Sequence, residues 1–237
     1  MKLTRILIFT FLFSSLMVNA QEKTENNSQT KKHNFSMDLG YSYRLSAEPN
    51  ELFQNQTYNS DHYSKLRHGF QINFAYDYAF KPSLAFGFKT SAFTSGNSLS
   101  SDADLLANSG VNVKDDMYIF YVGPSFKYIF PIFSDRYNFY ARATIGYMSL
   151  RNSEIKVGIS PTLTSISQSS VYTGHNFGWG IDGGIDYSIN DFLSVGFNAG
   201  LLGANINKLT VGEDKQTLKH SESLYRLDFS LVVRIKL

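Results

Sequence analysis

Five histidines are the residues of this chain whose imidazole could act as a general base at neutral pH. A serine nucleophile needs such a histidine within hydrogen-bond reach, and an acid that orients the imidazole. Counting back across the polar segment between them places His175 about opposite Ser149, and His62 stands two residues before Ser64. No acid is placed to orient either histidine, so we predict no catalytic residue and expect that the protein is not an enzyme. The other three histidines are His33, His68 and His220.

Other site chemistries leave no pattern in the sequence. There is no cysteine, no Gly-rich phosphate loop, no cluster of metal ligands and no basic patch with interleaved aromatics. We therefore expect no cofactor, no metal and no nucleic-acid partner. The small net positive charge comes from residues 1–20, which hold two of the 22 basic residues and no acid. If secretion removes them, 20 bases remain against 20 acids.

Charged side chains do recur in one phase of an alternating pattern. They are Asp38, Arg44, Asp77, Lys89, Lys127, Arg142, Asp182, Asp186, Arg226, Asp228 and Arg234. If that phase faces a narrow interior, opposite charges must pair there, because an isolated buried charge is costly. We expect an ion-pair network that fills a polar lumen, and we predict in particular that Arg142 pairs with Asp182.

The element that would position these charges is a β-strand, and the stretch from Arg67 to Thr94 shows it best. Large aromatic residues occupy every second position from Phe70 to Phe80 and again from Leu84 to Phe88, with small or polar residues between them. A period of two places the two sets on opposite faces of a strand. Large aromatics on one face and Gly, Ala, Asn, Asp and Lys on the other are typical of lipid outside and a narrow polar interior.

The same alternation predicts eight strands. They begin near Phe35, Arg67, Leu84, Met117, Tyr137, Asn176, Leu193 and Tyr225. Pro124 falls in the middle of the fourth strand, where it cannot donate a hydrogen bond, so we expect a local bulge there. Polar segments predicted as long loops alternate with short turns along the chain. The loops are Ser46–Leu66, Ser95–Asp116, Arg151–Thr173 and Asn207–Ser223.

This order predicts an all-β fold, an eight-stranded antiparallel up-and-down transmembrane β-barrel with all long loops at one end. An even number of strands lets the sheet close and hide its edges from hydrocarbon. Two aromatic girdles are expected at the water–lipid boundaries. One comprises Tyr78, Phe80, Tyr128, Phe130, Tyr137, Phe139 and Tyr187. The other comprises Tyr43, Phe70, Tyr118, Tyr147, Trp179 and Tyr225.

The start of the chain is predicted to be a secretory signal peptide over residues 1–20. Lys2 and Arg5 precede an apolar run from Ile6 to Val18, which is too short to span a bilayer, and Ala20 offers a cleavage site. Residues 21–34 are polar and are expected to form a periplasmic lead-in, which leaves 35–237 as the barrel domain. No apolar run of 18 or more residues follows, so we predict no transmembrane helix.

The layout resembles the small eight-stranded outer-membrane β-barrel family of Gram-negative bacteria, the group around outer membrane protein X and the membrane domain of outer membrane protein A. The stretch from Val122 to Phe130 resembles a strand-four motif of that family. Phe229 to Leu237 is similar to its C-terminal assembly signal, although Leu237 stands where a terminal Phe is usual. The resemblance implies the cell outer membrane, contact with lipid and lipopolysaccharide, and insertion by the barrel assembly machinery.

Functionally, we expect a monomeric outer membrane protein with a structural or surface-contact (adhesion-like) role, whose loops could meet extracellular ligands. One alternative is a narrow pore for small solutes or hydrophobic compounds, which the small diameter of an eight-stranded barrel disfavours. A remote alternative is a lipid-modifying enzyme. The lipid A deacylases carry His and Ser two apart on one strand, and the stretch from His175 to Phe177 lacks that spacing.

Overall fold

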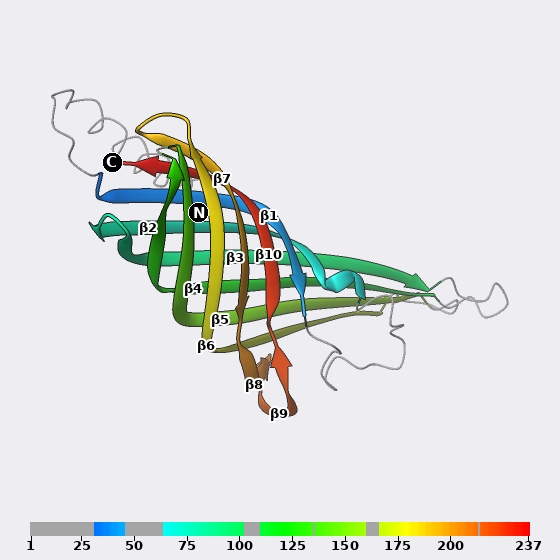
Figure 1. The fold of residues 1–237 in the computed structure, drawn as a ribbon. Coiled ribbons are helices and arrows are strands. Elements are labelled where there is room, and N and C mark those ends of the chain that lie inside the picture. Colours follow the sequence, from blue (N-terminus) through cyan, green and yellow to red (C-terminus); the bar gives the residue numbers. More distant parts are fainter. Residues whose placement is uncertain (1–30, 46–63, 102–109, 135, 160–165, 213) are drawn as a thin grey trace, which may run out of the picture.

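The computed structural model describes residues 31–45, 64–101, 110–134, 136–159, 166–212 and 214–237 (Figure 1). The predicted signal peptide lies outside the described residues. Ten strands are present in these ranges. They are β1 (His33–Arg44), β2 (His68–Lys81), β3 (Leu84–Ser101), β4 (Gly110–Ser134), β5 (Tyr137–Ile159), β6 (Ile166–Ser188), β7 (Leu193–Gly203), β8 (Asn205–Val211), β9 (Asp214–Ser223) and β10 (Arg226–Lys236).

Eight of these strands close into an antiparallel barrel, as the sequence predicted. Their order is β5-β4-β3-β2-β1-β10-β7-β6, and a further pairing of β5 with β6 closes the ring. The chain ends meet in one ladder, which runs from Asn34 opposite Lys236 to Arg44 opposite Arg226. Closure gives every strand of the ring two partners, so no open sheet edge is left inside the barrel wall.

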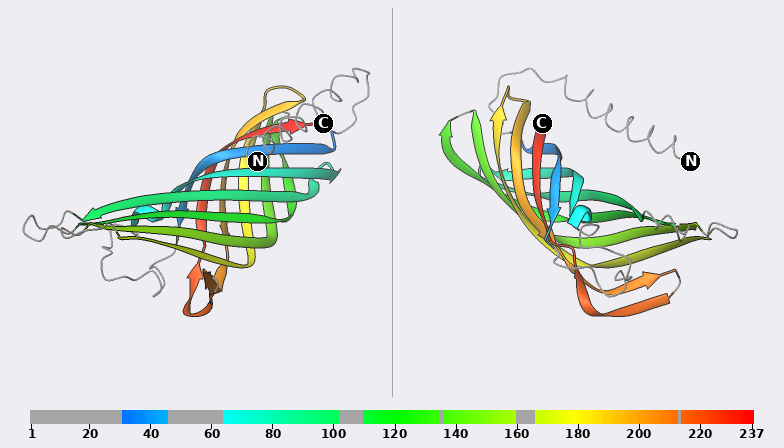
Figure 2. Two further views of the ribbon diagram at one scale, coloured as in Figure 1. Left: turned by 180° about the vertical axis from the view of Figure 1, so that it is seen from behind. Right: turned by 90° about the vertical axis from the view of Figure 1, so that its right-hand side faces the viewer.

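The two ends of the barrel differ, as Figures 1 and 2 show. At one end, the turn end, three short connections join β2 to β3, β4 to β5 and β6 to β7. In the last of these, the Asn190 side chain accepts hydrogen bonds from the backbone N–H groups of Phe192 (2.9 Å) and Leu193 (2.7 Å). All the longer connections lie at the opposite end, the loop end, which confirms the predicted alternation.

Much of the sequence predicted as long loops forms strands, which corrects that prediction. β3 and β4 remain paired out to Ser101 and Val111, and β5 and β6 out to Gly158 and Ile166. The fourth predicted loop is largely a hairpin of β8 and β9, and β8 also pairs with β6. Backbone that leaves the membrane keeps its hydrogen-bonding partners simply by continuing the ladder, even where Ser and Asn dominate the side chains.

The bulge predicted at Pro124 is absent. Val122 pairs with Tyr147 and Ser125 pairs with Thr144, so the offset between β4 and β5 is the same on both sides of the proline. The missing donor is accommodated because the ladder skips two rungs, and the Thr144 hydroxyl donates to the Pro124 carbonyl (2.9 Å). Register shifts occur instead near the turn end, between Ala79 and Lys81 and between Phe130 and Ser134.

The exterior of the ring carries the aromatic and aliphatic side chains that the alternation assigned to lipid. Phe74 is 37% exposed and Leu231 is 72% exposed. Both predicted girdles contain aromatic side chains in contact with each other. At the turn end the rings of Tyr137 and Tyr187 lie 5.2 Å apart, and at the loop end Trp179 Nε1 donates to Tyr225 Oη (3.1 Å). None of the helical turns in the described residues is long and apolar enough to cross a membrane.

A closed sheet in which every strand is paired should resist detergent until it is heated. We therefore expect the folded protein to migrate differently on a gel before and after boiling, and to give a β-type circular dichroism spectrum. A substantial helical signal from the folded protein would contradict the fold.

Phe74→Arg tests the face assignment, because Phe74 lies between the girdles on the lipid side of β2. We expect a loss of about 2–4 kcal/mol in the free energy of unfolding in lipid vesicles, since the cation must be desolvated or reach an interface. Ser98→Arg is the control, because Ser98 is exposed on β3 beyond the loop-end girdle. Equal losses for the two variants would mean that Phe74 does not face hydrocarbon.

Candidate functional site

The eleven charged residues that the sequence assigned to the interior all point inward and are buried, with exposed fractions of 6% or less. The ring positions them because alternate residues of each strand face the lumen. Their backbones belong to β1, β2, β3, β4, β5, β6 and β10. The prediction of this set is therefore confirmed in full.

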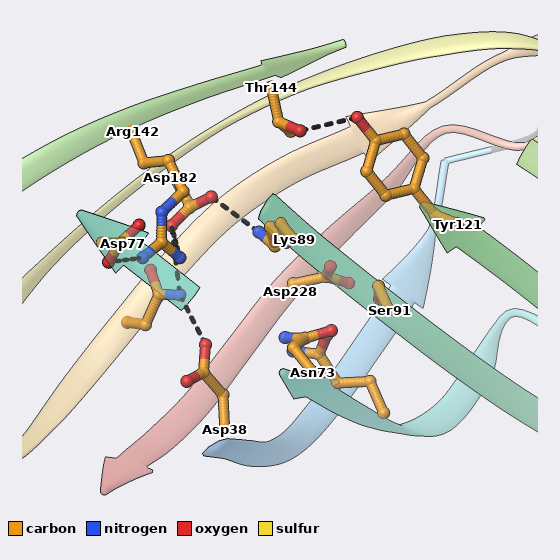
Figure 3. Close-up of polar contacts among 12 residues, drawn as sticks. Asp38, Asn73, Asp77, Lys89, Ser91, Tyr121, Arg142, Thr144, Asp182 and Asp228 are labelled. Atoms are coloured by element: carbon orange, nitrogen blue, oxygen red, sulfur yellow. Dashed lines mark hydrogen bonds and ion pairs between the residues drawn. The ribbon is translucent and has the colours of Figure 1, made fainter. Parts of the chain in front are cut away.

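The central part of the network joins opposite walls of the barrel (Figure 3). Arg142 on β5 lies 2.7 Å from Asp77 on β2, which Lys127 on β4 also approaches at 3.4 Å. Lys89 on β3 contacts Asp182 on β6 at 2.6 Å. Because these strands are not neighbours in the ring, the side chains must cross the lumen to meet. The pairs therefore act as cross-links as well as neutralising the charges.

The predicted pair of Arg142 and Asp182 is present, but it is not the shortest contact of either residue. The two residues face each other in the β5–β6 ladder, and Arg142 Nη1 lies 3.7 Å from Asp182 Oδ1. Asp77 is closer to Arg142, and Lys89 is closer to Asp182. Sequence register can locate a partner on the neighbouring strand, whereas the partners from across the lumen depend on the diameter of the barrel.

A second polar group lies nearer the loop end. Arg226 Nε donates to Asp228 (3.0 Å), and the Arg226 guanidinium also bonds to the Ser91 hydroxyl across the lumen. Above it, Arg44 pairs with Glu222 of β9 at 2.9 Å and donates to the carbonyl of Ser223 (2.9 Å). The β8–β9 hairpin is thus tied to the barrel wall by a buried ion pair.

The loop-end part of the interior is apolar, which sequence reasoning missed. Its buried cluster comprises Phe93, Met117, Ile119, Tyr121, Met148, Leu150, Leu202, Ala204, Ile206, Leu209, Leu218 and Leu224. A usable signal existed, because the alternation of apolar with polar residues stops near Ile119, Met148 and Leu202, where consecutive residues are all apolar. The predicted polar lumen is therefore correct for the middle and turn end only.

At the turn end, the ring of Tyr140 lies among three cations. Lys127 Nζ is 4.3 Å from the ring centroid, and the guanidinium carbons of Arg234 and Arg142 are at 4.7 Å and 5.8 Å. Arg234 also forms an ion pair with Asp186. A pocket of about 220 Å³ lies on this side of the lumen, and Tyr140 and Arg234 contribute to its lining.

The predicted register of Ser149 opposite His175 is correct. The His175 ring packs against Tyr147 with centroids 5.6 Å apart, and His68 is bonded to the hydroxyl of Tyr41 (2.5 Å). His33 lies in β1 rather than in a lead-in, where it meets the Tyr76 hydroxyl at 2.8 Å. His62 lies outside the described residues, and His220 is exposed on β9.

Groups that could hold a metal ion, meaning three or more His, Cys, Asp or Glu together, do not occur in the part of the chain that the structure describes. Outside the membrane region, Tyr172 packs at the edge of the apolar cluster and donates to Glu154 (3.5 Å). Burial, and then the negative charge of Glu154, raise the pKa of the Tyr172 hydroxyl, so it remains a neutral donor.

Comparison with known proteins gives similarity of structure only. No family model and no curated protein matches the sequence. Neisserial surface protein A is 14% identical, with 86% of this chain and 97% of that chain covered and a TM-score of 0.43. Ail, the attachment invasion locus protein of Yersinia pestis, is 12% identical, with coverages of 86% and 98% and a TM-score of 0.38. The outer membrane protease OmpT from Escherichia coli is 10% identical, with coverages of 91% and 100% and a TM-score of 0.34. At these levels the likeness gives no information on activity, ligand or partner.

The ion-pair geometry predicts which charges are energetically coupled. Arg142→Met and Asp77→Leu should each destabilise the barrel by roughly 3–5 kcal/mol, because each removes the closest partner of a buried charge, and the double variant should lose much less than the sum. The coupling energy from refolding titrations should be larger for Arg142 with Asp77 than for Arg142 with Asp182. Arg142→Met combined with Asp228→Leu is the control and should be additive. Additivity of the Asp77 pair would contradict the cross-lumen contact.

Proposed function

We propose that the chain is an outer membrane β-barrel of the Gram-negative type and that its work is surface contact: the filled barrel would hold a rigid sheet outside the cell, and a partner would bind to that sheet. In such barrels the short turns face the periplasm and the longer connections face outward. The loop end is therefore the extracellular end, and the turn end is the periplasmic one.

The observation that carries this proposal is the length of the strands beyond the extracellular girdle. β5 continues from Tyr147 to Ile159, and β6 runs from Ile166 before it reaches Trp179. Twelve or so residues at about 3.4 Å each extend the sheet by roughly 40 Å along the strands. Figure 2 shows β3 to β6 continuing well past the ring. A barrel that only sealed or stiffened the membrane would not need this extension.

The exposed surface of the extension suits a hydrated partner. Among its described residues, the exposed side chains include the hydroxyls of Ser98, Ser169 and Thr173 and the charges of Lys114, Asp116 and Arg151, and Lys114 forms an ion pair with Asp116 (2.9 Å). Such a surface supplies hydrogen-bond donors and acceptors for a polar protein or saccharide surface. The ladders hold this surface in a fixed shape, since Asp116 pairs with Ser153 and Lys156 with Gln168.

The interior supports contact over passage. The central ion pairs cross the lumen, and the apolar residues above them pack on one another, with Ile119, Met148 and Ile206 fully buried. Eight strands enclose room for side chains and little else. The apolar cluster is nevertheless the one feature that favours the alternative, a route for hydrophobic compounds. Catalysis by Ser149 and His175 is not part of the proposal.

Two further partners follow from the same proposal. The apolar exterior and its girdles would contact lipid and lipopolysaccharide. The last strand, with Leu231, Val233 and Ile235 facing outward, would present the C-terminal signal to the barrel assembly machinery. The protein would act as a monomer.

Trimming the extension tests the proposal. In one variant Asn-Gly turns replace residues 98–114 and 153–171, which should leave the membrane-embedded ring and its heat-modifiable gel behaviour intact, because the ring makes its own ladders. Cells that produce the full chain should adhere to immobilised laminin, collagen or a cell monolayer, and the trimmed variant should lose that adhesion.

Single-channel recording of the refolded full chain is the companion measurement. We expect no stable conductance, because the cross-lumen pairs obstruct the path. Undiminished adhesion by the trimmed, folded variant would contradict surface contact. Steady conductance that increases when Lys89 and Asp182 are both replaced by Ala would favour the pore.

A further inference from the structure

The periplasmic mouth of the barrel contains a pocket of about 220 Å³, far more than one water molecule needs. It lies between residues 31–32, the β2–β3 turn and the inward side chains of β4, β5, β6 and β10. Its lining comprises Lys31, Lys32, Asn34, Ala79, Phe80, Lys81, Pro82, Lys127, Ile129, Asn138, Tyr140, Asp186, Arg234 and Lys236. The pocket is at the opposite end from the surface proposed for contact, so the two can be tested separately.

The lining is strongly cationic. It includes five lysines and Arg234, and its one acid, Asp186, is engaged by Arg234. Acids just outside the lining do not restore the balance. Asp77 is shared between Lys127 and Arg142, and Asp182 is paired with Lys89. Asp38 accepts a hydrogen bond from Asn198. A concave site lined by one sign of charge concentrates ions of the opposite sign.

Two of the side chains that contribute to the lining, Arg234 and Tyr140, carry buried polar atoms without partners. Arg234 is 3% exposed, and its Nε and Nη2 atoms make no hydrogen bond, while another nitrogen of the same guanidinium holds Asp186. Nε and Nη2 form the side edge of the guanidinium, a two-donor fork that matches two oxygens of a carboxylate or phosphate. The Tyr140 hydroxyl, also buried, has no partner either. Such donors also occur elsewhere in the lumen, as at Arg142 Nε and Arg226 Nη1, but here they lie beside an excess of cations that an anion would balance.

We propose that this pocket binds a phosphate-type oxyanion. One pair of oxygens would face the Arg234 fork, a third would take the Tyr140 hydroxyl, and Lys81 and Lys236 would neutralise the charge at the entrance. A tetrahedral group suits donors that converge from several strands better than a planar carboxylate does. Free phosphate, a phosphomonoester and the headgroup of a glycerophospholipid share this chemistry, and the mouth lies level with the periplasmic aromatic girdle, where headgroups lie.

The test uses the full mature chain refolded in dodecyl maltoside, a detergent without phosphate. Inorganic phosphate and glycerol 3-phosphate are titrated against sodium chloride at constant ionic strength, with calorimetry and the thermal unfolding midpoint as measurements. We expect saturable heat and a rise in the midpoint that chloride does not produce, because a ligand bound only to the folded state stabilises it.

Three variants assign the binding to this pocket. Arg234→Lys keeps the charge and loses the fork, and should weaken phosphate binding about tenfold or more. Lys81→Gln removes an exposed entrance charge without touching the folded network and should weaken it by roughly fivefold, as expected for about 1 kcal/mol. Lys208→Gln is the matched control, since Lys208 is exposed on β8 at the extracellular end, and should bind as the parent does.

Phosphorus NMR distinguishes the sources of the anion. If the phosphorus signal of dihexanoyl phosphatidylglycerol broadens in the same micelles, and Arg234→Lys relieves the broadening, the ligand is a lipid headgroup. If only the signal of inorganic phosphate behaves in this way, the ligand is a free anion. Absence of saturable binding by all three probes would overturn the proposal. So would binding that Arg234→Lys and Lys81→Gln leave unchanged, or that Lys208→Gln weakens equally.

Discussion

The structure depends on one constraint: in hydrocarbon each backbone N–H and C=O must find a partner within the protein. Pairing of β1 with β10 and of β5 with β6 meets that constraint with the eight strands of the ring. The small circumference then determines the interior. Side chains from different walls are close enough to bond, so inward charges pair across the lumen, with Asp77 shared by Arg142 and Lys127. The ionic interior is thus a consequence of closing a narrow sheet.

The side chains that fill the barrel change from polar to apolar along its axis. Polar side chains fill the middle and the turn-end part, whereas the loop-end part is filled by residues such as Phe93 and Ile206. The apolar residues lie where the β8–β9 hairpin joins the wall, and there they do the work of an ordinary hydrophobic core. The hairpin therefore folds as part of the barrel, fixed by the Arg44–Glu222 ion pair, and not as a loop resting on it.

Sequence alone predicted the ring, the alternation of its long and short connections, its apolar outer face and the charged part of its inner face, because a period of two is imposed on every strand by lipid on one side and charge on the other. It also placed Arg142 opposite Asp182 and Ser149 opposite His175, since register across a hairpin can be counted. It failed where that contrast ends. Beyond the girdle the outer face of β5 and β6 no longer meets lipid and needs no large apolar side chains, so Ser- and Asn-rich strands look like loops. The Arg142–Asp77 contact was unpredictable, because it depends on the distance across the lumen and not on neighbouring register.

The extracellular sheet shares its ladders with the membrane wall without a joint: β5 pairs with β6 from Tyr137 opposite Tyr187 to Gly158 opposite Ile166 in one register. Hydrogen bonds in an antiparallel ladder lie perpendicular to the strands. A pull applied to the outer tip therefore acts in shear along the strands and is divided among many rungs at once, instead of peeling them one by one. The cross-lumen ion pairs brace the wall against ovalisation under the same load. A pulling force on the sheet would thus be transmitted to the membrane-embedded ring before the strands could separate.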